Sequence, residues 1–104
     1  MHIYQNFRGI CIIYAVYYDV LLMPLLSRLS SLQHLSVDYN QLTDLPVEMC
    51  ALLRLEEFHA ANNQLTSLPL EFGFLVNLEK LHLQKNKIRE LPEVLKGLNI
   101  FQRN

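Results

Sequence analysis

The sequence predicts a fold of the α/β class, a solenoid in which short coils stack and each coil contributes one strand to a parallel sheet. The prediction rests on three consecutive segments of equal length, residues 29–51, 52–74 and 75–97. Asparagine recurs in them at positions 40, 63 and 86, each time within the same frame of leucines and followed by a fixed proline. Amphipathic helices do not account for that proline, because proline inside a helix costs about 3 kcal/mol.

Each segment is expected to begin with a strand. Residues 35–37 lie in a stretch where apolar and polar side chains alternate, which is typical of a half-buried strand. The equivalent residues 58–60 and 81–83 are then expected to lie beside it in a parallel sheet. The sheet would form one side of the solenoid, with its polar side chains directed outward.

The repeated asparagine follows each predicted strand, where the chain must turn away from the sheet. A sharp turn leaves backbone groups without partners, and an amide side chain supplies both donors and an acceptor. We therefore predict that Asn40, Asn63 and Asn86 form a structural ladder, each amide buried beneath one turn.

A short outer segment is predicted after each turn. Proline fixes φ and suits the first turn of a short helix. The prolines, and the apolar residues expected to point from the outer segments into the core, are Pro46, Pro69, Pro92, Met49, Phe72 and Leu95.

The frame LxxLxLxxNxL followed by LxxLP resembles the leucine-rich-repeat family, and within it the intracellular class of Ras-suppressor, Ras-scaffold, Erbin and Scribble proteins. The resemblance covers residues 29–97 well and residues 98–101 in part. It implies a scaffold that binds signalling proteins, often small GTPases or phosphatases, on the concave sheet face.

The two ends of the chain differ from the repeats. Residues 98–104 are expected to be a truncated fourth repeat, as in a fragment or a truncated product of a longer gene. Residues 1–28 contain an apolar run, 10–26, that is interrupted only by Asp19. Three interpretations stay open: a degenerate first repeat or cap, with Ile13 at the position of Leu35; a signal peptide or membrane anchor; and a loosely folded extension. The first is favoured.

Charge, cysteines and missing motifs narrow the function classes. Nine basic and ten acidic side chains nearly balance, so the sequence lacks the excess of basic charge that is typical of nucleic-acid-binding proteins. Cys11 and Cys50 stand apart, which suits a reducing compartment better than a disulfide framework. The sequence contains no glycine-rich phosphate loop, HExxH motif or nucleophile elbow. We therefore predict a cytoplasmic, non-enzymatic protein without a cofactor.

The outward side chains of the predicted sheet form the candidate binding site. They align in columns from repeat to repeat, and Ala61 and Asn62 complete two of these columns. The predicted protein-binding residues are His34, Ser36, Asp38, Tyr39, Glu57, His59, Lys80, His82, Gln84 and Lys85.

Two histidines of this site, His59 and His82, are predicted to be neighbours. His59 and His82 share a column on neighbouring strands ~4.8 Å apart, so the two rings can touch, with Glu57 nearby and able to pair with Lys80. Such a pair can bind a metal or act as a proton switch. Exposed polar residues on a solvated face are the commoner case, and we predict no metal site.

The predicted function is a non-catalytic protein-interaction module that binds a partner on the concave face. Two alternatives stay open: a membrane-tethered or secreted recognition fragment, and a truncated isoform with little function of its own.

Overall fold

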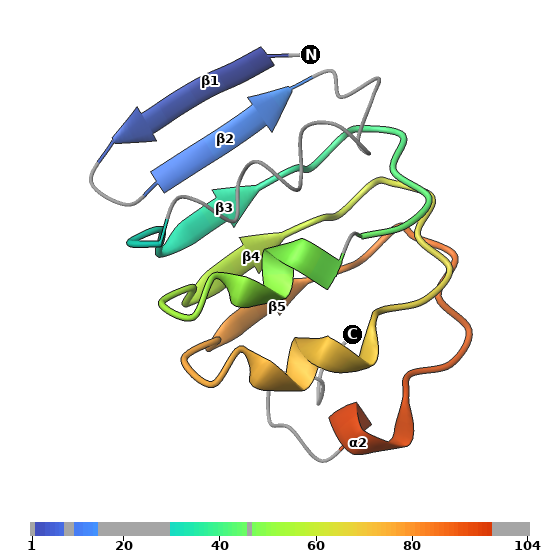
Figure 1. Cartoon of the computed structure of the whole chain (residues 1–104). Helices are drawn as coiled ribbons and strands as arrows, with labels where there is room; N and C mark the ends of the chain where they lie inside the picture. The colour runs from blue at the N-terminus through green and yellow to red at the C-terminus, as the bar shows by residue number, and fades with distance from the viewer. Residues whose placement is uncertain (1, 8–9, 15–29, 46, 97–104) are drawn as a thin grey trace.

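The computed structural model describes residues 2–7, 10–14, 30–45 and 47–96. These residues contain a five-stranded sheet whose spatial order follows the chain, β1-β2-β3-β4-β5 (Figure 1). The strands are β1 (His2–Phe7), β2 (Ile10–Tyr14), β3 (His34–Ser36), β4 (Glu57–His59) and β5 (Lys80–His82). Two 3-10 helices, Val47–Ala51 and Leu70–Phe74, and the short helix α2 (Glu93–Lys96) form the opposite side of the coils.

The three repeat strands are parallel and pair in the register that the repeats predict. Leu35 pairs with Phe58, and Phe58 pairs with Leu81. Each strand begins one residue before the predicted stretch. Backbone bonds continue beyond the strand ends, where the Val37 N–H donates to the His59 carbonyl at 2.7 Å. The solenoid predicted from the period is therefore confirmed.

An antiparallel hairpin precedes the repeats, because β1 and β2 pair with each other and β2 pairs in parallel with β3. The strand β2 thereby covers an edge of β3 that would otherwise expose unpaired backbone groups. Its register differs from the degenerate-repeat alignment, since Cys11 and not Ile13 pairs with Leu35. Residues 15–24 of that alignment and the truncated fourth repeat lie outside the described residues.

The core lies between the sheet and the outer segments. The central residue of each repeat strand is buried, and Met49, Phe72 and Leu95 are no more than 1% exposed, as predicted. Pro69, with φ of −67°, directly precedes the second 3-10 helix rather than lying in its first turn. The rings of Phe58 and Phe72 pack at 6.0 Å with a 58° tilt, an arrangement worth about 1 kcal/mol beyond burial. Strand and outer segment are thus joined through apolar contacts.

The asparagine ladder joins consecutive coils. The Asn63 amide donates to the carbonyls of Val37 in the preceding coil, at 3.0 Å, and of Ala60 in its own coil, at 3.2 Å. Its Oδ1 accepts the Leu42 N–H of the preceding coil at 3.0 Å. Asn86 repeats the pattern one coil later, and Asn40 donates to the Val37 carbonyl at 2.7 Å. Asn63 is buried as predicted, whereas Asn40 and Asn86 are half-buried.

The residue before each ladder asparagine adopts a left-handed backbone conformation. Tyr39, Asn62 and Lys85 have φ values of 58°, 59° and 62°. Such φ values are unfavourable for residues other than glycine, asparagine and aspartate. The tight turn therefore imposes backbone strain at Tyr39 and Lys85, which the amide bonds of the following asparagine help to offset.

Candidate functional site

The repeat strands direct alternate side chains away from the core. In β3 and β4 the central residue is buried and its two neighbours are half-buried, and in β5 the neighbours are Lys80, exposed, and His82, half-buried. Because the three strands are in register, the outward residues stand in two rows across the sheet. One row is His34, Glu57 and Lys80, and the other is Ser36, His59 and His82.

Glu57 lies at the centre of this face and contacts three cationic or titratable side chains. The Nε2–H of His59 donates to its Oε2 at 2.6 Å, and His34 Nδ1 lies 3.6 Å from its Oε1. Lys80 Nζ lies 4.0 Å from the same Oε1, so the predicted pairing is present but long. The hydrogen bond from His59 is the main cause that lowers the pKa of the Glu57 carboxyl; burial opposes it, and the charges of His59, Lys80 and His34 add to it. Glu57 therefore remains a carboxylate.

His59 and His82 stack, as their shared column predicts. Their ring centroids are 4.2 Å apart and the ring planes differ by only 6°. The strand register fixes this contact, since the two residues are direct partners across β4 and β5.

Other predicted residues lie where the strands turn into loops. Tyr39 is 77% exposed and Lys85 is exposed, both at the left-handed turn position. Gln84 is exposed, and its backbone carbonyl accepts the Asn62 N–H at 3.0 Å. Ala61, predicted to face outward, is only 3% exposed.

Asp38 has a structural contact that the sequence did not predict. Its Oδ1 accepts the backbone N–H of Ala61 in the next coil at 2.7 Å, and its own N–H lies 3.5 Å from the hydroxyl of Ser36. The equivalent residues in the next two repeats, Ala61 and Gln84, carry no carboxylate and cannot make the same contact. The pattern of the repeats therefore contained no signal for it.

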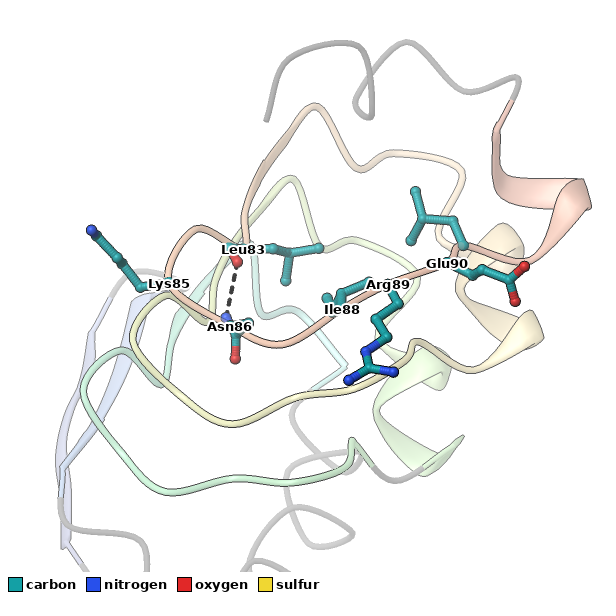
Figure 2. A pocket seen from close by; sticks show the side chains of 7 residues that line it. Leu83, Lys85, Asn86, Ile88, Arg89 and Glu90 are labelled. Atoms are coloured by element: carbon teal, nitrogen blue, oxygen red, sulfur yellow. Dashed lines mark hydrogen bonds between the residues drawn. The ribbon is translucent and has the colours of Figure 1, made fainter.

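A separate hollow of about 310 Å³ lies on the coil that follows β5, at the opposite side of the array from the hairpin. Figure 2 shows its lining and the hydrogen bond from the Asn86 amide to the Leu83 carbonyl, at 2.9 Å. Its lining residues are Leu83, Lys85, Asn86, Ile88, Arg89, Glu90 and Leu91. The repeat pattern does not indicate this hollow, although Ile88 and Leu91 occupy repeated apolar positions.

Comparison with known families agrees with this architecture. The model described as "Leucine Rich Repeat" matches residues 31–53, and the model described as "Leucine Rich repeats (2 copies)" matches residues 53–99. Residues 31–99 are leucine-rich repeats. In general, leucine-rich repeats mediate protein–protein interaction and are non-catalytic. The matched residues contain the strands β3, β4 and β5 and the whole outward cluster around Glu57.

A solved leucine-rich-repeat protein of Leptospira interrogans is similar to this chain, with 38% sequence identity and a TM-score of 0.70. The similarity covers 74% of this chain and 20% of that protein, so the chain spans about a fifth of its relative's length. None of the curated proteins matches the sequence.

Two further observations concern the apolar run and Cys50. Among the described residues, no helix has the length and apolar character required to span a membrane, and residues 10–14 of the apolar run form the strand β2. Cys50, expected on the outer segment, is a buried free thiol. Burial raises its pKa to about 11, and the charge of Glu71 adds to the effect.

Proposed function

We propose that the outward face of the repeat sheet binds a protein partner without catalysing a reaction. Solenoids present extended surfaces built from equivalent positions of successive repeats, and leucine-rich repeats generally use such surfaces for protein recognition. The observation that carries the proposal is the contact network around Glu57.

That network favours binding because it fixes polar side chains before a partner arrives. The Glu57 carboxylate is held by His59 and faces His34 and Lys80, while His59 stacks on His82. Long side chains that are already ordered lose less conformational entropy on association. A partner with complementary donors and acceptors would meet a preorganised surface.

The turn residues extend this surface. The three repeat strands at ~4.8 Å spacing, with three paired residues each at ~3.3 Å rise, give a projected face of roughly 140 Å². A standard interface buries about 800 Å² on each partner. Tyr39 and Lys85, both exposed at the adjoining turns, supply further area, and tyrosine is a favoured anchor at protein interfaces.

We further propose that the protein is an intracellular scaffold of signalling proteins. Its partner would be a small GTPase or a phosphatase, and its compartment the cytoplasm. This proposal is supported by the resemblance of the repeat frame LxxLxLxxNxLxxLP to that class. The buried thiol of Cys50 and the absence of cysteine clusters in the sequence agree with a reducing compartment.

Site-specific photo-crosslinking tests the binding face. A photoreactive side chain at Lys80 samples the sheet face, and one at Glu48, exposed on the first 3-10 helix, samples the opposite side. In cell extract, we expect defined crosslinked products from position 80 and not from position 48. Tyr39→Ala should reduce them at least fivefold. Equal products from both positions would contradict a binding role for the sheet face.

Fractionation tests the compartment. A full chain with a C-terminal tag should remain in the supernatant when cell membranes are sedimented. Retention in the membrane pellet after a carbonate wash would replace the cytoplasmic proposal with the membrane-tethered alternative.

A further inference from the structure

Three potential metal ligands converge on the outward face of β4 and β5. Glu57, His59 and His82 each offer one ligand atom, and these atoms all lie within 4.8 Å of one another. All three side chains are half-buried, and they come from adjacent, hydrogen-bonded strands whose register is fixed by the repeat. The cluster is therefore placed by backbone pairing and not by a mobile loop.

Two imidazoles and a carboxylate form a ligand set that zinc uses in proteins, with one further position left open. We propose that Glu57, His59 and His82 bind one Zn²⁺ ion on the outward sheet face. The fourth position is open to water or to a side chain of a binding partner.

Small side-chain movements complete the site. Metal–ligand bonds of about 2.1 Å in a tetrahedral arrangement place ligand atoms about 3.4 Å apart. The Glu57–His59 contact of 2.6 Å must open, with the ion taking the place of the proton on His59 Nε2 and that proton leaving to solvent. The stacked rings lie in parallel planes, so one imidazole must turn about its Cβ–Cγ bond to aim its nitrogen at the ion. That torsion has a broad energy profile and permits the turn.

Neighbouring side chains orient the carboxylate. His34 Nδ1 lies 3.6 Å from Oε1 of Glu57, which leaves Oε2 directed toward His59. Outer partners of this kind hold ligands in the binding orientation. Lys80 also faces Oε1, at 4.0 Å, but its side chain is 66% exposed and can move into solvent when a cation binds.

Zinc binding at this cluster does not require the proposed protein partner. Zinc binding is measured on the isolated chain, whereas partner binding is measured by crosslinking in extract. Failure of one experiment leaves the other proposal unchanged.

Calorimetric titration with ZnCl₂ at pH 7.5 tests the site directly. The full chain should be untagged and should carry His2→Gln, because the terminal amine together with His2 is a second potential chelator. We expect saturable binding of one Zn²⁺ per chain. Loss of one ligand in Glu57→Gln or His82→Gln should weaken binding by at least about tenfold.

Glu79→Gln is the matched control, since Glu79 is an exposed carboxylate in the next repeat and the substitution is the same as at Glu57. It should bind zinc as the parent chain does. Circular dichroism of the zinc-free variants establishes that each remains folded. If one ligand variant unfolds, the zinc affinity of the other ligand variant tests the site. The visible spectrum of Co²⁺ bound to the parent chain gives a second test, and tetrahedral bands are expected. Unsaturable binding, equal affinity in ligand and control variants, or a spectrum of six-coordinate Co²⁺ would mean an adventitious ion only and would overturn the proposal.

Discussion

The side-chain Oδ1 of Asn63 accepts the backbone N–H of Leu42, 21 residues earlier in the chain, at 3.0 Å. The same amide donates to the Val37 carbonyl at 3.0 Å, so a single side chain bonds to the preceding coil as both acceptor and donor. Its 7% exposure means that water cannot replace these bonds. The ladder therefore holds the coils together and also completes the turn within each coil.

Asn63→Ala should lower the free energy of unfolding by roughly 1–3 kcal/mol more than Gln64→Ala, because it leaves buried backbone groups unpaired. Gln64 is a suitable control, since its side chain is exposed and its backbone N–H still donates to the Leu42 carbonyl. Chemical denaturation followed by circular dichroism measures both variants. Equal losses at the two positions would count against the ladder.

Asp38→Ala should destabilise the chain by about 1–2 kcal/mol, because the Ala61 N–H loses a charge-assisted acceptor at 2.7 Å. Asp38→Asn retains a carbonyl acceptor of the same shape and should restore at least half of that loss. The measurement is again equilibrium denaturation. If Asn behaves no better than Ala at this position, the hydrogen bond to the next coil does not contribute to stability.

Lys85→Asn should raise stability by about 0.5–1 kcal/mol, since asparagine tolerates the left-handed conformation that lysine avoids. Asn62 already occupies the equivalent position one repeat earlier, with φ of 59°. Lys87→Asn removes the same charge at an exposed position without left-handed φ and serves as the control. A gain of equal size in the control would point to charge, and not to backbone conformation, as the cause.

Cys50 should resist alkylation in the folded protein. With its pKa raised from 9.0 to about 11, the thiolate fraction at pH 8 falls about a hundredfold, and burial restricts access further. A Cys11→Ser chain leaves Cys50 as the single thiol, and mass spectrometry measures its reaction with iodoacetamide before and after unfolding. Similar rates in the two states would show that the thiol is accessible.

The same shift makes stability depend on pH. The folded state binds the thiol proton more tightly than the unfolded state, so the contribution of Cys50 is complete below pH 9 and is lost as pH rises toward 11. Cys50→Ala in the same Cys11→Ser chain should therefore lose less stability across that interval than its parent. A decline as steep as the parent's would show that other groups cause it.

Much of the repeat fold was predictable because the period placed equivalent residues beside one another. The burial of Phe72, the amide bonds of Asn63 and the contact between His59 and His82 all follow from that register. The register of β2 did not follow. Pairing Cys11 or Ile13 with Leu35 differs by two residues, and a two-residue shift preserves the alternation of side chains between faces. An apolar run is compatible with both.

By itself, the sequence determined which residues stack, because a period of 23 and a fixed asparagine admit one register of parallel coils. Only the tertiary structure decided how the outward polar side chains pair. Glu57 could reach Lys80, His34 or His59, and the 2.6 Å contact goes to His59 on its own strand. Such choices depend on rotamers and short distances that a repeat pattern does not specify. The ligand geometry around Glu57 therefore became visible only in three dimensions.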